Sequence, residues 1–128
     1  MHKVLIAIGS NHRQSVHVQW ASQWLSKLLD NCLLSRCLWT PDIKGTGRWY
    51  MNRLAVGNTS LSPTELEQRL KEAEVMLGRT KQQVTIDLDL MLYDGVQYHL
   101  SDWPRPYIQQ LLQDIVKEIG SVSVINSQ

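Results

Sequence analysis

The segment Thr85–Leu92 (TIDLDLML) constrains the fold of this chain more than any other stretch. Every second residue is a large aliphatic one, which predicts a half-buried β-strand with one face on a core. Asp87 and Asp89 project from the opposite face, with Cα atoms ~6–7 Å apart. Aspartate is a poor strand former and like charges on one strand face repel. A divalent cation between the two carboxylates and a solvated pair of acids are therefore both open interpretations.

The N-terminal part predicts a strand followed by a helix. The apolar run Lys3–Ile8 indicates a central strand buried on both faces, and Gly9 ends it in a turn. Ser10 or Asn11 can cap a helix over 16–30, whose aliphatic residues recur near helical spacing. The tryptophans of this helix are expected to pack and not to bind a ligand.

Two more strands are expected before the next helix. Residues 33–39 alternate in polarity and are ended by Thr40–Asp42, and residues 43–49 contain glycines that indicate a loop. Residues 50–59 form the following strand, in which Gly57 indicates a bulge.

The clearest local signal is a helix start. Ser62, Pro63 and Glu65 form a capping box with proline at the first helical position. Leucines and alanine then repeat at helical spacing, so residues 63–77 are predicted as a helix, with Gly78 as its left-handed C-terminal cap.

The C-terminal part predicts short elements after the aspartate strand. They are a turn at 93–95, a brief strand at 96–99, a break at 103–106, a helix over 107–119 ended by Gly120, and an edge strand over 121–125.

This order of elements defines the expected fold class. Strand, helix, two strands, helix and strand form a split βαβ unit, so the chain is predicted to be an α+β, ferredoxin-like sandwich. Its antiparallel sheet carries helices on one face, with a C-terminal helix added. The aliphatic residues of the aspartate strand should face the helices, and Asp87 and Asp89 should lie on the open face.

Composition narrows the classes of function. The chain has 128 residues, 43% hydrophobic and 20% charged, and is expected to form one domain over 1–128. A net charge of +1 gives no attraction to nucleic acid or to an anionic membrane. No signal peptide or membrane-spanning run is apparent. Cys32 and Cys37 match neither a zinc site nor a disulfide framework, so a cytoplasmic location is expected.

Several segments together resemble one enzyme family. Their order and spacing over residues 4–95 are similar to those of 6-hydroxymethyl-7,8-dihydropterin pyrophosphokinase of folate biosynthesis. The matching segments are Ile6–Asn11, Thr40–Pro41, Tyr50–Asn52, Ser60–Leu66, Glu74, Gly78–Arg79 and Thr85–Leu92.

The resemblance implies a reaction and a cofactor. Members of this family transfer the terminal pyrophosphoryl unit of ATP to the hydroxymethyl group of the pterin. Two Mg²⁺ ions are expected with ATP bound, held by aspartates that map onto Asp87 and Asp89. This fits the preference of Mg²⁺ for one or two carboxylates together with phosphate oxygens.

The resemblance also implies a pterin site. Tyr50 and Asn52 would line it, and Thr40, Pro41 and Asp42 would contact the edge of the ring. An asparagine offers both a donor and an acceptor to such a ring. Without the resemblance, Asn52 reads as an ordinary strand residue.

Three residues map onto the ATP side of the family's site. Glu74 and Arg79 match an acid near ATP and an arginine on a loop that closes over the phosphates, which gives Arg79 a catalytic role beside Asp87 and Asp89. Arg105 stands where the family has a histidine. Without the resemblance, Glu74 is better explained as part of a solvated helix face. Arg79 is explained equally well as a surface arginine after the end of a helix.

The chain departs from the family pattern in its loops. The connection Thr80–Val84 is shorter, lacks a tryptophan, and has Val84 in place of a second arginine. Lys81 can substitute only in part, because an ammonium lacks the guanidinium fork. Beyond residue 95, Trp103 and Tyr107 are the candidates for the aromatic wall of the pterin site.

Three interpretations follow from these features. A compact pyrophosphokinase acting on ATP and a pterin is favoured, because both aspartates are kept. A catalytically impaired paralogue that binds pterin, nucleotide or metal is the alternative. An RNA-binding module of the same fold is disfavoured, because the chain has no aromatic pair of the RNA-recognition type. An exposed last strand could pair between chains and form a homodimer.

Overall fold

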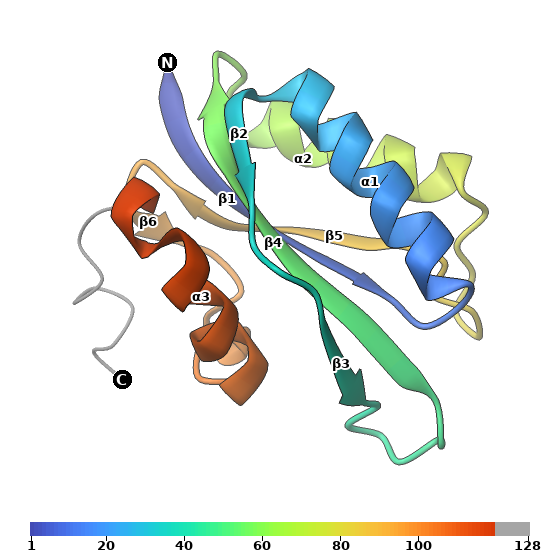
Figure 1. Cartoon of the computed structure of the whole chain (residues 1–128). Coiled ribbons are helices and arrows are strands. Elements are labelled where there is room, and N and C mark those ends of the chain that lie inside the picture. Colours follow the sequence, from blue (N-terminus) through green and yellow to red (C-terminus); the bar gives the residue numbers. More distant parts are fainter. Residues whose placement is uncertain (120–128) are drawn as a thin grey trace.

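The N-terminal apolar run forms the centre of a six-stranded antiparallel sheet in the computed structural model, which describes residues 1–119. Strand β1 (His2–Ser10) pairs with β4 on one side and with β5 on the other (Figure 1). The other strands are β2 (Asp30–Leu34), β3 (Leu38–Pro41), β4 (Trp49–Thr59), β5 (Asp87–Tyr93) and β6 (Val96–Gln97). The strand order is β2-β4-β1-β5-β6, and β3 also pairs with β4.

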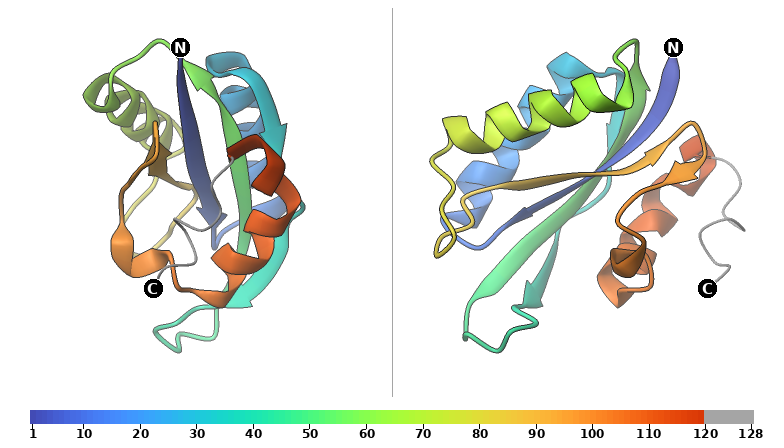
Figure 2. Two further views of the ribbon diagram at one scale, coloured as in Figure 1. Left: turned by 90° about the vertical axis from the view of Figure 1, so that its left-hand side faces the viewer. Right: turned by 180° about the vertical axis from the view of Figure 1, so that it is seen from behind.

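Helices cover both faces of this sheet, but unequally. Helices α1 (Gln14–Leu28) and α2 (Pro63–Met76) pack on one face, and α3 (Pro106–Ile119) packs on the other (Figure 2). The predicted α+β, ferredoxin-like class with a C-terminal helix is therefore confirmed. The second face is not wholly open, because a short 3-10 helix, η1 (Leu100–Asp102), leads into α3 over part of it.

The aspartate strand alternates as predicted only in its first half. Ile86, Leu88 and Leu90 lie in the core beneath α1 and α2. The pairing with β1 then shifts register, so that Leu5 pairs with Leu92 while Ile6 pairs with Leu90. The extra residue is Met91, and Leu92 packs under α3. The expectation that Leu92 faces the same helices as Leu88 was wrong, because a β-bulge reverses the faces.

The single strand predicted over 33–39 is divided into β2 and β3, both paired with β4. Ser35 explains the division. Its hydroxyl accepts the Leu54 N–H at 2.8 Å, while its own carbonyl oxygen accepts from Arg53 Nε at 2.7 Å. A side chain thus takes over one backbone bond of the ladder and turns the strand. Thr40 and Pro41 belong to β3, so the strand ends two residues later than predicted.

The bulge expected at Gly57 lies on the neighbouring strand. Gly57 pairs in regular register with Val4. The irregularity is in β2, between Asp30 and Leu33. Gly57 allows Leu29 to pack closely against β4, because a Cβ at position 57 would stand 2.9 Å from the Leu29 Cβ.

The second helix begins and ends as predicted. Ser62 Oγ accepts the Glu65 N–H, and Glu65 Oε1 accepts the Ser62 N–H, which completes the capping box. At the other end Gly78 adopts a φ of 75°, and the Arg79 N–H donates to the Glu74 carbonyl at 3.2 Å. This is the hydrogen bonding of a Schellman cap.

The first helix starts differently from expectation. Arg13, with a φ of 44°, occupies the N-cap position, and no side chain caps the helix. Neither proposed cap is available, because Ser10 bonds to His12 and Asn11 bonds to Val84.

The remaining C-terminal elements follow the predicted order. Asp94 and Gly95 both have positive φ and form the tight turn between β5 and β6. Gly120 and the predicted strand 121–125, with the dimer that could form through it, lie outside the described residues. Within residues 1–119, no helix is long and apolar enough to span a membrane.

Candidate active site

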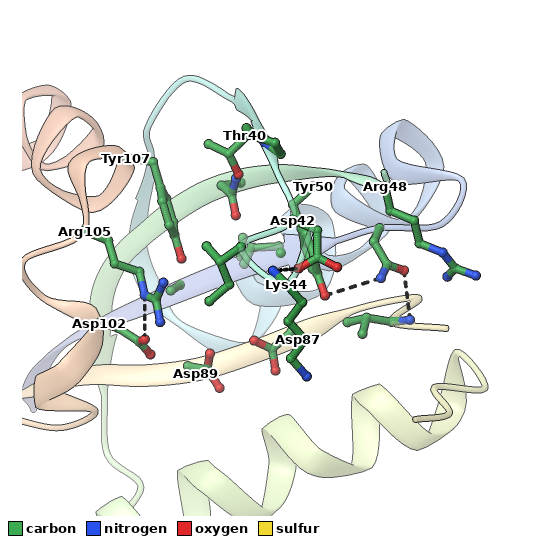
Figure 3. Close-up of a pocket in the computed structure, with 18 of the residues that line it drawn as sticks. Thr40, Asp42, Lys44, Arg48, Tyr50, Asp87, Asp89, Asp102, Arg105 and Tyr107 are labelled. Carbon is green, nitrogen blue, oxygen red and sulfur yellow. Dashed lines mark hydrogen bonds and ion pairs between the residues drawn. The ribbon is translucent and has the colours of Figure 1, made fainter. Parts of the chain in front are cut away.

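A cavity of about 650 Å³ opens on the second face of the sheet, beside the start of α3. Figure 3 shows side chains entering it from β5, from the β3–β4 hairpin and from the segment around Arg105. The floor is formed by residues of β1, among them Ala7 and Gly9.

Sheet register explains why the floor is hollow. Asp87 pairs with Gly9, which in turn pairs with Asn52 on β4. Asp89 pairs with Ala7 in the next row. Residues opposite one another point to the same face of a sheet. Gly9 and Ala7, which have small side chains, therefore lie between the two aspartates of β5 on one side and strand β4 on the other. The sheet is thereby opened at the place where the carboxylates project.

Negative charge is concentrated at the β5 side of the cavity. Asp87 and Asp89 both line it, and Asp102 lines it from the end of η1 (Figure 3). Burial raises the pKa of Asp89 far above its usual range, and a hydrogen bond with Asp87 and the charges of Asp87, Glu74 and Asp102 raise it further. Such accumulation of acids is characteristic of a functional site.

Arg79 does not line the cavity but adjoins it through Asp87. Its Nη1 lies 2.6 Å from Asp87 Oδ1 and 3.1 Å from Glu74 Oε2. Glu74 Oε2 also accepts the Leu88 N–H at 2.8 Å. Burial raises the pKa of Glu74, while the Leu88 N–H and Arg79 oppose that effect. Glu74 and Arg79 are thus joined to the aspartate strand by ion pairs and a hydrogen bond.

The residues mapped to the pterin all line the cavity. They are Thr40, Pro41, Asp42, Tyr50 and Asn52. Asn52 Nδ2 donates to Thr40 Oγ1 at 2.8 Å and to the Leu38 carbonyl at 3.3 Å, which fixes the plane of the amide.

Three hydrogen bonds shape the same wall. The Tyr50 hydroxyl accepts a hydrogen bond from Asn11 Nδ2 at 3.3 Å. Asp42 accepts from the Lys44 N–H at 3.0 Å and from the Thr46 hydroxyl at 2.6 Å. The loop after β3 is therefore ordered by its own aspartate.

The family comparison agrees with this geometry. The sequence model of the 7,8-dihydro-6-hydroxymethylpterin-pyrophosphokinase family matches residues 5–117. The chain belongs to this pterin pyrophosphokinase family. Its members are ATP-dependent pyrophosphokinases of folate biosynthesis, so membership assigns the chain to this class of transferase. No curated protein sequence matches the chain.

The segment after η1 supplies the last wall of the cavity. Arg105 lines the cavity, and its Nε donates to Asp102 Oδ1 at 2.9 Å. Of the two aromatic candidates, Tyr107 lines the cavity, whereas Trp103 is buried under α3. Burial raises the pKa of Tyr107 to about 12.

Several cavity residues were not expected from the sequence, among them Lys44 and Arg48 from the loop between β3 and β4. Lys81 of the shortened connection, the suggested partial substitute for the missing arginine, also lines the cavity, as does Val84. Arg48 Nη1 donates to the Gln82 carbonyl at 2.7 Å, so the two loops are joined beside the cavity. Lys44 and Arg48 lie in the sequence between Asp42 and Tyr50, two residues that the resemblance had placed in the site, and this position could have indicated them.

The donor set suits the magnesium that this family uses. Within residues 1–119 there is no cluster of three or more histidine, cysteine or acidic side chains able to enclose a metal. Asp87 and Asp89 provide hard oxygen donors from one strand face, although Asp87 is also paired with Arg79. Mg²⁺ is typically held in this way, by one or two carboxylates together with water and phosphate oxygens.

Proposed function

We propose that this chain transfers the terminal pyrophosphoryl group of ATP to 6-hydroxymethyl-7,8-dihydropterin. The hydroxymethyl oxygen forms a bond to the β-phosphorus and loses its proton, and the bond from that phosphorus to the AMP oxygen breaks. The observation that carries this proposal is the row Asp87–Gly9–Asn52, which puts a carboxylate and the amide mapped to the pterin in one cavity.

Asp87 and Asp89 are proposed to hold magnesium, two ions when ATP is bound. When bound, magnesium supplies charge neutralisation and alignment at the transferring phosphate. The chain contributes two carboxylates fixed on one strand, which need not reorganise during the reaction.

The pterin is proposed to bind against Thr40, Pro41, Asp42, Tyr50 and Asn52. The fixed amide of Asn52 presents its Oδ1 acceptor to the ring, because its Nδ2 donates to Thr40 and to the Leu38 carbonyl. Tyr107 is suited to a second wall because its phenol is half-buried and neutral.

ATP is proposed to bind on the side of Arg79 and Arg105, with Glu74 holding Arg79 in place. Guanidinium groups match phosphate oxygens in geometry and in charge. Arg79 acts in catalysis together with Asp87 and Asp89.

A second candidate is a paralogue that binds these ligands without turnover. Two observations favour it: both arginines of the ATP side are paired with carboxylates, and Val84 lines the cavity where the family has an arginine. Missing cations at a transferring phosphate typically reduce the rate by orders of magnitude.

Release of AMP from ATP, Mg²⁺ and 6-hydroxymethyl-7,8-dihydropterin distinguishes the two candidates. We expect activity in the wild-type chain and a loss of roughly two orders of magnitude or more in Asp87→Ala and Asp89→Ala. Asp30→Ala, an exposed aspartate of β2, is the matched control. Wild-type activity no higher than that of the double variant would exclude the enzyme. Calorimetry with the pterin and then with an ATP analogue would then identify a binding paralogue.

A further inference from the structure

The guanidinium of Arg79 is paired with Asp87, a carboxylate that is proposed to bind magnesium. The same nitrogen of Arg79, Nη1, contacts Asp87 Oδ1 at 2.6 Å and Glu74 Oε2 at 3.1 Å. Arg79 therefore stands between two acids, one on the proposed metal site and one behind it.

The position of Arg79 is set by the end of a helix. The turn at Gly78 and the hydrogen bond from the Arg79 N–H to the Glu74 carbonyl bring the chain back along α2. The Glu74 side chain is only 15% exposed, and it is fixed to β5 through the Leu88 N–H. Glu74 is thus a rigid anchor, whereas Asp87 is half-exposed and faces the cavity.

A divalent cation and a guanidinium compete for one carboxylate. Both are attracted by the charge of Asp87, and they repel each other when held side by side. Binding of one therefore weakens binding of the other, and the effect is reciprocal.

We propose that Arg79 is an exchangeable counter-ion, which neutralises Asp87 in the free protein and turns to the polyphosphate once a divalent cation is bound there. Glu74 is the positioning residue that keeps Arg79 at the site during the exchange. This inference rests on the proposed function, because it takes Asp87 as a metal ligand.

The proposal predicts effects of opposite sign for one substitution. Arg79→Gln frees Asp87, so the affinity for metal alone rises. The same change removes a phosphate partner, so the affinity for a nucleotide in saturating Mg²⁺ falls.

Arg105 provides a matched control. Its pair with Asp102 resembles the pair of Arg79 with Asp87, with a distance of 2.9 Å against 2.6 Å and side-chain exposures of 32% and 28% against 34% and 32%. Arg105→Gln also removes one guanidinium charge near the two aspartates but leaves Asp87 paired with Arg79.

The experiment is a calorimetric titration of the full chain with manganese(II) chloride in the absence of nucleotide. We expect binding to tighten roughly threefold to tenfold in Arg79→Gln, and clearly less in Arg105→Gln. A second titration with a non-hydrolysable ATP analogue in saturating Mg²⁺ should show weaker binding in Arg79→Gln. Equal tightening in both variants, or none in Arg79→Gln, would overturn the proposal. Arg79→Lys keeps the charge and should stay close to the wild type in the metal titration.

Asp87→Asn separates failure of this inference from failure of the proposed function. If that variant binds manganese as tightly as the wild type, Asp87 is not a metal ligand and both proposals fall. If Asp87→Asn loses manganese binding while Arg79→Gln leaves it unchanged, only the exchange of partners is refuted.

Discussion

Asn52 and Asp87 lie on either side of Gly9 in one row across strands β4, β1 and β5. With adjacent strands 4.7–4.9 Å apart, their Cα atoms are separated by about 10 Å. The gap between them is the width of one missing side chain, and it forms the floor of the cavity. The amide proposed to bind the pterin and the carboxylate proposed to bind the metal thus face one space from two sides.

Gly9→Ala should preserve the fold and impair binding. A Cβ there would stand 3.6 Å from Asn52 Oδ1 and 3.8 Å from Tyr50 Cδ2, which are ordinary contacts. We expect the free energy of unfolding to stay equal or to rise by up to ~1 kcal/mol, because alanine restricts the unfolded chain. The added methyl group should weaken pterin binding roughly tenfold in a fluorescence titration.

Gly57→Ala is the contrasting variant. Its Cβ would meet the Leu29 Cβ at 2.9 Å and the Asp30 carbonyl oxygen at 3.1 Å. We expect a loss of about 1–3 kcal/mol in urea unfolding. If Gly9→Ala were as unstable as Gly57→Ala, Gly9 would serve packing and not the cavity.

Asn11 should stabilise the shortened connection before β5. Its backbone N–H donates to the Val84 carbonyl at 2.9 Å, and its Oδ1 accepts the Val84 N–H at 2.9 Å. Asn11→Ala leaves the Val84 N–H without its partner, so urea unfolding should show a loss of about 1–3 kcal/mol. Asn11→Asp keeps the acceptor and should recover most of this loss. Equal losses in the two variants would contradict the assigned role of Oδ1.

Thr40→Val tests the orientation of the pterin amide. The variant keeps the shape of the side chain but removes the acceptor that holds Asn52 Nδ2 at 2.8 Å. Pterin binding should weaken about fivefold, which corresponds to one hydrogen bond of ~1 kcal/mol, while binding of an ATP analogue stays the same. Thr59→Val, at the far end of β4, controls for loss of a hydroxyl elsewhere on the strand. A similar loss of nucleotide affinity in Thr40→Val would argue against a role confined to the pterin.

Asp94 should make the stability of the fold depend on pH. The hydrogen bond from His2 holds the pKa of Asp94 below its usual value, and the Lys3 N–H adds to this effect. Because the folded-state pKa is the lower one, ionised Asp94 stabilises the fold above about pH 4. This contribution is lost as the pH falls through the folded-state pKa.

The measurement is the thermal midpoint of the wild type and of Asp94→Asn, followed from about pH 7 to about pH 2. Asparagine tolerates the φ of 48° at this position, so the change removes mainly the charge. We expect the wild type to be more stable at neutral pH and the difference to vanish at the acidic end. A constant difference over the whole range would assign it to the turn and not to the carboxylate.

Elements with local causes were predictable from the sequence. The capping box of Ser62 and Glu65 and the cap at Gly78 involve residues close together in the chain, and the structure reproduces them. The alternation around Asp87 and Asp89 likewise placed both carboxylates on one face of β5. The family resemblance read from these segments is confirmed by the match over residues 5–117.

Features that depend on distant residues were not predictable in this way. The turn at Ser35 needs Leu54, and the uncapped start of α1 follows from the bond between Asn11 and Val84. The change of side-chain faces at Met91 depends on how β5 pairs with β1. Each of these depends on a partner far away in the sequence, which no local pattern contains.

The sequence by itself therefore determined most of the elements, their order, and the face on which Asp87 and Asp89 lie. The tertiary structure decided which residues lie next to the two aspartates on that face. It placed Gly9 between Asp87 and Asn52, and it brought Arg105 into the cavity that the two aspartates line. It also paired Arg79 with Asp87. The physical reason is that periodicity and caps act over one or two turns of chain, whereas a cavity and its charges are set by strand register and packing across the whole sheet.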